Sequence, residues 1–138
     1  NIKIAETLSE YNHILIYNSS KTFNEIVLMQ KRFNTNFPFI CETGGGIYHK
    51  NLFNQVSDKL REGYSIMYEA KKIEMFKDII KEEVQKNFKK DLDIFDDLCL
   101  DEKSRLSGLR GNDLHLASER DFSMLISWKS DELRYSKF

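Results

Sequence analysis

The chain has 138 residues, of which 41% are hydrophobic and 31% charged, a composition typical of one globular domain or two small ones. Its 21 Lys and Arg residues nearly balance 22 Asp and Glu residues, and the net charge of -1 argues against a nucleic-acid partner. No apolar run approaches the ~20 residues that span a bilayer, and the first residues lack the apolar core of a signal peptide, so we expect a cytoplasmic protein with no membrane partner. Cys41 and Cys99 form no CxxC pair, and we expect both to be reduced thiols.

The first forty residues predict alternating helices and strands. Residues 2–12 and 22–34 have the apolar spacing of helices, whereas residues 13–17 form an apolar run without alternation, which is typical of a buried parallel strand. Residues 37–41 predict a second short strand. This order predicts an α/β fold with a parallel sheet and a right-handed crossover.

The turn after the first strand is the most informative segment. Ser19, Ser20 and Lys21 follow the apolar run, and Thr22 and Glu25 then fit a capping box that starts a helix. Free amides and the helix dipole favour an anion at such a place, so the turn predicts a phosphate site. In the alternative interpretation the serines are plain turn and cap residues, and Lys21 is merely exposed.

A triple glycine follows the second strand, within residues 42–48. Composition alone favours a hairpin turn, because glycine adopts backbone angles closed to other residues. A loop whose backbone approaches a ligand closely would have the same composition. The segment is not a P-loop, because no Gly-Lys-Ser/Thr follows.

The remainder predicts a β-α-α-α-β unit, with a boundary near residues 49–58. Its predicted elements are a strand at 64–69, an amphipathic helix at 72–89, a helix from Asp101 through Leu106 stopped by Gly108, a helix capped by Asn112 and running to Glu119, and a strand from Phe122 to Trp128. Asp91-Leu-Asp93 is predicted to be a solvated helix–loop junction. His115 is interpreted as a packed or surface histidine, and three scattered histidines give little support to a zinc site.

Four segments in order resemble the mannosyl-3-phosphoglycerate phosphatases, a branch of the haloacid dehalogenase-like phosphohydrolases. They are Asn18-Ser-Ser-Lys-Thr22, Pro38-Phe-Ile-Cys-Glu-Thr-Gly-Gly-Gly-Ile-Tyr48, Ser107-Gly-Leu109 and Leu116-Ala-Ser-Glu-Arg-Asp-Phe-Ser123. The resemblance implies a Rossmann-like core with an inserted α+β cap. Residues 1–55 would then be a partial core, and residues 56–138 would be mostly cap.

The resemblance also implies roles for single residues. Ser19 would hydrogen-bond the transferring phosphoryl group of a phosphorylated small molecule. Arg120 and Ser123 would match cap positions that contact the carboxylate or phosphate end of the substrate, for which the planar fork of arginine is suited. A structural ion pair of Arg120 with Glu119 or Asp121 is the alternative. The other substrate-binding residues implied are Ser20, Lys21, Glu42, Gly44 and Gly45.

The departures from the family pattern bear on activity. Family members have an Asp-x-Asp strand that supplies the nucleophile, and a lysine and a Gly-Asp-x-x-x-Asp segment that complete a Mg²⁺ site. This sequence has no Gly-Asp-x-x-x-Asp segment, and Asp91-Leu-Asp93 resembles the nucleophile motif only superficially, because Phe88-Lys-Lys90 precedes it in place of an apolar strand and Ile94-Phe95 follows it in place of Gly-Thr. We therefore expect no phosphatase turnover from the chain alone. Thr43 and Met124 stand where the family usually has asparagine and glutamate.

Two other functions are compatible with the sequence. The chain could bind an anion without cleaving it, or it could be an interaction module whose sheet is completed by a second copy or by another chain. The second alternative arises because a two-stranded core has an open edge, and open edges invite pairing.

Overall fold

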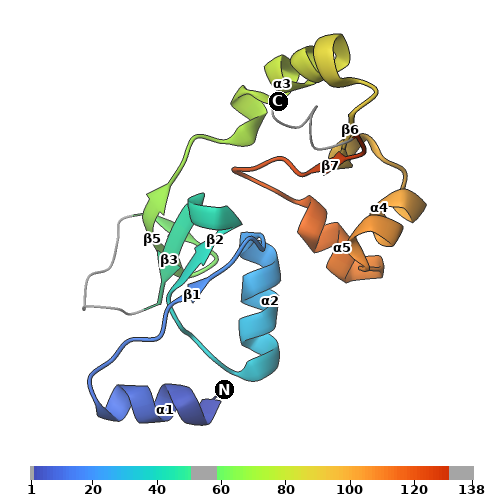
Figure 1. Ribbon diagram of the computed structural model, residues 1–138. Coiled ribbons are helices and arrows are strands. Elements are labelled where there is room, and N and C mark those ends of the chain that lie inside the picture. Colours follow the sequence, from blue (N-terminus) through green and yellow to red (C-terminus); the bar gives the residue numbers. More distant parts are fainter. Residues whose placement is uncertain (1, 51–58, 131–138) are drawn as a thin grey trace. The chain divides into compact units, whose positions relative to one another are not determined.

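The computed structural model describes residues 2–50 and 59–130 of the chain (Figure 1). The fold is mixed α/β, as predicted, and it divides into two compact units, residues 1–70 and 71–138. The predicted boundary near residue 55 lies outside the described residues, so the division into core and cap stays a prediction. Two strands beyond residue 59 hydrogen-bond into the first sheet, and the division between the two units lies after Ala70. Within the described ranges, every helix is too short or too polar to cross a bilayer.

The first unit is built on a five-stranded sheet. Its elements are α1 (Ile2–Glu10), β1 (Tyr17–Asn18), α2 (Phe23–Phe33), β2 (Phe39–Cys41), a 3₁₀ turn (Glu42–Gly44), β3 (Gly46–His49), β4 (Leu60–Arg61) and β5 (Tyr64–Glu69). The strand order is β1-β2-β3-β5-β4, and only β1 and β2 are parallel. The predicted parallel pair joined by a helix is confirmed, but the sheet as a whole is mixed rather than parallel.

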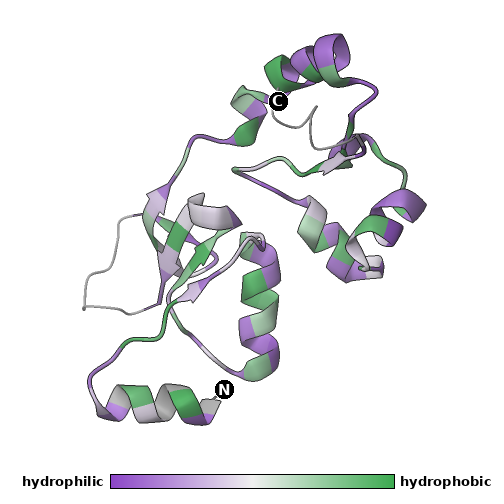
Figure 2. Cartoon of the chain, in the orientation of Figure 1, coloured by the Kyte–Doolittle hydropathy of each residue, from purple (hydrophilic) through white to green (hydrophobic). Residues whose placement is uncertain are grey.

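Helix α2 begins where the capping box predicted. The Glu25 amide donates to the Thr22 hydroxyl at 3.2 Å, and the Thr22 amide donates to the Glu25 carboxylate at 2.9 Å. The helix ends at Asn34 in a left-handed conformation. Both apolar and polar residues lie along α2 (Figure 2), and Phe23, Ile26 and Val27 are buried.

The prediction for residues 13–17 is wrong in two respects. The strand covers only Tyr17–Asn18, and the side chains of Ile14 and Ile16 are each 51% exposed instead of buried. The physical reason is the position of β1 at the edge of the sheet, where it pairs with β2 alone among the described strands. An apolar run predicts a preference for burial but does not supply the layer that buries it.

The core of the first unit is a cluster of four aromatic rings. Phe23 lies within 4.7–5.7 Å of the ring centroids of Phe39, Tyr48 and Tyr64. The Tyr48 ring also lies over Gly46, where an added Cβ would come within 2.5 Å of a ring carbon. Glycine at position 46 is therefore required by close packing against the tyrosine.

The Tyr48 phenol is fully buried and donates a hydrogen bond to Glu69 Oε1 at 2.6 Å. Burial above all, and then the hydrogen bond and charge of Glu69, raise the pKa of Tyr48 above its ordinary value. Burial likewise raises the pKa of Tyr64. Because the folded pKa is the higher one, the stabilisation is complete below the unfolded pKa of about 10 and is lost as the pH rises through the folded value.

We therefore expect the free energy of unfolding to fall above pH ~10, by up to about 1.4 kcal/mol per pH unit for each ionising tyrosine. Urea titrations over this range measure the slope. Tyr48→Phe should remove its share of the slope, whereas Tyr68→Phe, at a half-exposed position of β5, should leave the slope unchanged. Equal slopes for the wild type and Tyr48→Phe would contradict the assignment.

The second unit combines short helices with a two-stranded sheet. Its elements are a 3₁₀ turn (Ile73–Met75), α3 (Lys77–Glu83), a π-helical turn (Val84–Phe88), β6 (Leu92–Ile94), a 3₁₀ turn (Phe95–Asp97), α4 (Leu100–Ser107), α5 (Gly111–Ser118) and β7 (Ile126–Trp128). Strands β6 and β7 are antiparallel. The core contains Val84, Leu92 and Ile94, against which Phe88 and Trp128 pack.

Several boundaries in this unit differ from the predictions. The helix predicted at 72–89 is divided into 3₁₀, α and π segments. The amphipathic pattern predicts one buried stripe of Ile73, Phe76, Ile79, Ile80, Val84 and Phe88, but Phe76 and Ile79 are exposed. Gly108 ends α4 with φ +72°, as predicted. The N-caps are Cys99 and Arg110 rather than Asp101 and Asn112, and the strand predicted from Phe122 begins only at Ile126.

The interpretation of Asp91-Leu-Asp93 as a solvated junction is wrong. Leu92 and Ile94 are buried on β6, and Asp91 is only 3% exposed. Its carboxylate accepts a hydrogen bond from the Ser130 hydroxyl, and its backbone oxygen accepts one from the Lys129 amide at 2.7 Å. Asp91 therefore holds the residues that follow β7 against the start of β6 through these hydrogen bonds.

Candidate functional site

The predicted phosphate-binding turn lies at the carboxyl ends of β1 and β2. The Ser19 amide donates to the Ile40 oxygen at 3.0 Å. The Thr43 amide donates to the Ser19 oxygen at 3.1 Å, and the Glu42 amide donates to the Lys21 oxygen at 2.9 Å. The parallel pairing thus brings the serine turn and the start of the glycine loop together, although they are more than twenty residues apart in the sequence.

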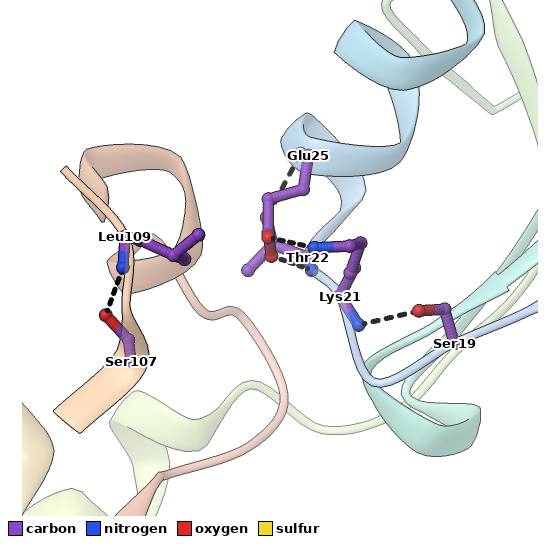
Figure 3. Close-up of polar contacts among 6 residues, drawn as sticks. All are labelled: Ser19, Lys21, Thr22, Glu25, Ser107 and Leu109. Atoms are coloured by element: carbon purple, nitrogen blue, oxygen red, sulfur yellow. Dashed lines mark hydrogen bonds and ion pairs between the residues drawn. The ribbon is translucent and has the colours of Figure 1, made fainter. Parts of the chain in front are cut away.

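Ser19 is held in place by its own turn. Its hydroxyl oxygen accepts a hydrogen bond from the Lys21 amide at 3.2 Å (Figure 3). A hydroxyl is also a donor, and across residues 2–50 and 59–130 no acceptor takes the Ser19 proton. The side chain is half-buried, so its oxygen is positioned by the protein while its proton remains available to an anion.

The turn offers fewer free amides than the sequence analysis expected. The amides of Ser19, Lys21, Thr22 and Glu25 all donate to protein oxygens. The ammonium of Lys21 forms an ion pair with Glu25 Oε1 at 2.9 Å, and its side chain is 46% exposed (Figure 3). The expectation of exposed amides is therefore wrong for these four residues, and the Ser19 hydroxyl is the donor left available among the groups described above.

The glycine loop is a tight hairpin between β2 and β3. Glu42, Thr43 and Gly44 have consecutive positive φ angles of +47°, +57° and +106°. Glu42 is buried, and the Gly45 amide closes the turn by donating to the oxygens of Cys41 and Glu42. The hairpin interpretation is confirmed, while substrate binding by Glu42, Gly44 and Gly45 stays a prediction.

The second unit brings together the two predicted cap residues. Arg120 Nε donates to the Ser123 hydroxyl at 2.8 Å, in the loop between α5 and β7. The adjacent Asp121 forms an ion pair with Lys72 at 3.1 Å. Arg120 and Ser123 therefore lie within one short loop, and their contact with a substrate stays a prediction.

The Ser107-Gly-Leu109 segment, the third motif of the resemblance, ends α4. The Ser107 hydroxyl accepts from the Leu109 amide at 3.1 Å (Figure 3) and donates to the Lys103 oxygen at 2.7 Å. Gly108 supplies the left-handed residue that a helix end requires. The local role of this motif is helix termination.

Mg²⁺ is the cofactor that the resemblance implies. Among the residues that the structure describes, no three His, Cys, Asp or Glu side chains are grouped so that they could hold a metal ion. Beside the serine turn, both carboxylate oxygens of Glu25 are engaged, one by Lys21 and one by the Thr22 amide. The described residues therefore do not fit a magnesium site.

A groove in the second unit was not predicted from the sequence. It has a volume of about 940 Å³ and is lined by residues of α4, α5 and the segment that joins them. None of the predicted site residues lines it. The signal for it in the sequence is the spacing of Lys103, Arg105 and Arg110 around a helix-ending glycine.

Comparison of the sequence with models of known protein families and with curated proteins finds no match.

Proposed function

We propose that this chain carries the phosphoryl-binding turn and the cap of a haloacid dehalogenase-like phosphatase resembling the mannosyl-3-phosphoglycerate phosphatases. The observation that carries the proposal is the place of Ser19. Ser19 follows β1 at the carboxyl-terminal end of the parallel strands β1 and β2, and its backbone is hydrogen-bonded to the glycine loop that follows β2. Anionic ligands of α/β sheets bind at the carboxyl-terminal ends of the strands.

Ser19 would act by donating its hydroxyl proton to a phosphoryl oxygen. The Lys21 amide fixes the serine oxygen, so the donor is pre-oriented. Lys21 would add positive charge at the same place. Its surface ion pair with Glu25 contributes little to stability, so the exposed ammonium can leave the carboxylate and contact a more strongly charged anion. Ser20 lies between them, at an exposed position.

The backbone of the glycine loop supports the family resemblance independently of the turn. Thr43 has a φ of +57°, a conformation that asparagine adopts much more readily than a β-branched residue. The resembled family usually has asparagine at this position. Gly44, with φ +106°, lies where few residues other than glycine fit.

The only Asp-x-Asp segment of the sequence does not supply a nucleophile in this proposal. Asp91 is buried against Ser130, and Asp93 forms an ion pair with Lys129 at 2.8 Å. Both carboxylates therefore tie β6 to β7. Since a positioned carboxylate nucleophile is what phosphoryl transfer in this superfamily requires, we propose that the chain alone binds a phosphate monoester without turning it over.

Calorimetric titration of the purified chain with mannosyl-3-phosphoglycerate tests the binding role. We expect Ser19→Ala to weaken binding about tenfold, because one hydrogen bond to a charged group is lost, and Ser19→Thr to retain binding because it keeps the hydroxyl. If Ser19→Ala binds as tightly as the wild type, the proposed role of Ser19 is contradicted. An assay of the same protein with Mg²⁺ should detect no hydrolysis, and saturable turnover would refute the proposed inactivity.

A non-catalytic interaction module that needs a partner chain is the second candidate. The edge position of β1 favours it, because an edge strand can pair with another strand, and the half-exposed side chains of Ile14 and Ile16 just before β1 offer apolar surface beside that edge. The mass in solution distinguishes the candidates. A chain that stays monomeric at all concentrations would count against completion by a second copy.

A further inference from the structure

The groove of the second unit is formed by two short helices joined by a tight connection. Residues from the N-terminal part of α4 and from α5 line it, and Leu114 among them is buried. Its lining residues are Leu100, Asp101, Lys103, Ser104, Arg105, Arg110, Gly111, Leu114, His115 and Ser118.

The groove is cationic although the chain is slightly acidic. Lys103, Arg105 and Arg110 line it against a single carboxylate, that of Asp101, while the whole chain has a net charge of -1. Within residues 2–50 and 59–130, neither arginine side chain forms an ion pair or a hydrogen bond, and both residues are exposed.

This lack of partners sets the two arginines apart from nearby lysines. Lys72, Lys77 and Lys129 of the same unit each lie within 3.1 Å of a carboxylate oxygen. Lys103 lies over the Phe95 ring at 5.7 Å, and within residues 2–50 and 59–130 its ammonium forms no ion pair. A pair of unpaired guanidinium groups in a groove is the arrangement that recognises a doubly charged oxyanion, through two parallel hydrogen bonds from each fork.

The first turn of α5 adds backbone donors at the same place. Arg110 is the N-cap residue, and its side chain makes no capping bond, as expected of a group that has no acceptor. Gly111 follows with φ +53°, and no atom from another part of the chain lies within 4 Å of the place where its Cβ would be. There is therefore space beside the start of α5, where the first amides of a helix can donate to an anion.

We propose that the groove between α4 and α5 binds the phosphate group of a small organic phosphate, with Arg105 and Arg110 as the principal ligands. The site is in the second unit and shares no residue with the serine turn. A result that contradicts the proposed function therefore leaves this proposal unaffected, and the reverse also holds. Leu100 and Leu114 offer apolar surface to the carbon skeleton, and the volume of about 940 Å³ leaves room for a ligand larger than the bare ion.

The test is a titration of the ¹⁵N-labelled full chain followed by NMR, with inorganic phosphate in one arm and glycerol 3-phosphate in the other. We expect saturable shifts of the Gly111 amide in both arms and tighter binding of the ester. The double variant R105Q/R110Q should bind glycerol 3-phosphate about tenfold more weakly.

The matched control is K89Q/K90Q, which removes two exposed positive charges of the same unit away from the groove and should leave the affinity unchanged. Ser19→Ala should also leave the Gly111 shifts unchanged, which separates this site from the serine turn. No saturable shift in the wild type, or an equal loss of affinity in both double variants, would overturn the proposal. Tighter binding of inorganic phosphate than of the ester would overturn the assignment to an organic phosphate.

Discussion

Phe23→Ala should lower the free energy of unfolding by about 3–5 kcal/mol, a loss among the largest that we expect from a single substitution in the first unit. Phe23 is 1% exposed, and its ring contacts those of Phe39, Tyr48 and Tyr64 at once. Its removal would leave a cavity among rigid aromatic rings, which relax little, and it would remove three favourable ring contacts. Urea unfolding followed by circular dichroism measures the loss.

Phe33→Ala is the matched control for this experiment. Phe33 is the last residue of the same helix, and it is 59% exposed. The substitution removes the same atoms from a position that buries little surface, so its cost should be below about 1 kcal/mol. Similar losses for the two variants would mean that the aromatic cluster is not the core of this unit.

Leu92→Ala should destabilise the second unit by about 2–5 kcal/mol. Leu92 is 2% exposed and lies in the core with Val84 and Ile94. It is also directly opposite Trp128 in the β6–β7 pair. Because Trp128 is the single tryptophan of the chain, its fluorescence reports the unfolding of this unit.

Leu106→Ala, at a 48% exposed position of α4, serves as the comparison. We expect its fluorescence transition to stay within about 1 kcal/mol of the wild type. If Leu92→Ala also left the transition unchanged, β6 would not be a core strand, and the original interpretation of Asp91-Leu-Asp93 as a solvated junction would be restored.

Local signals predicted the parts of the fold that depend on neighbouring residues. The start of α2 was predicted correctly because Thr22 and Glu25 satisfy each other within one turn. Gly108 ended α4 as predicted for the same kind of reason, since a left-handed residue is a local requirement. Strand β5 was also found at its predicted place, residues 64–69.

The misses depend on partners that are distant in the sequence. Strand β6 has the alternation of polar and apolar residues that is typical of a half-buried strand, but three residues are too few to distinguish it from a loop without its partner β7. Ile14 and Ile16 were predicted to be buried because they are apolar, yet their exposure is decided by what packs over an edge strand.

The same distinction between local signals and distant partners applies to the candidate sites. The turn at Ser19 is encoded locally, so its position was predictable, but the acceptors of its amides include the Ile40 oxygen and the carboxylate of Glu25. The groove between α4 and α5 depends on how two helices pack. Its arginines were visible in the sequence, whereas their lack of partners within the described part of the chain was not.

The two thiols of the chain differ in a way that is useful for experiment. Cys41 is fully buried in β2, whereas Cys99 is exposed at the residue that precedes α4, and neither forms a disulfide. A maleimide dye should therefore label the folded protein selectively at Cys99, next to Leu100 at the wall of the groove. The natural sequence thus already contains a handle for an optical sensor of ligand occupancy, with no cysteine to be added or removed.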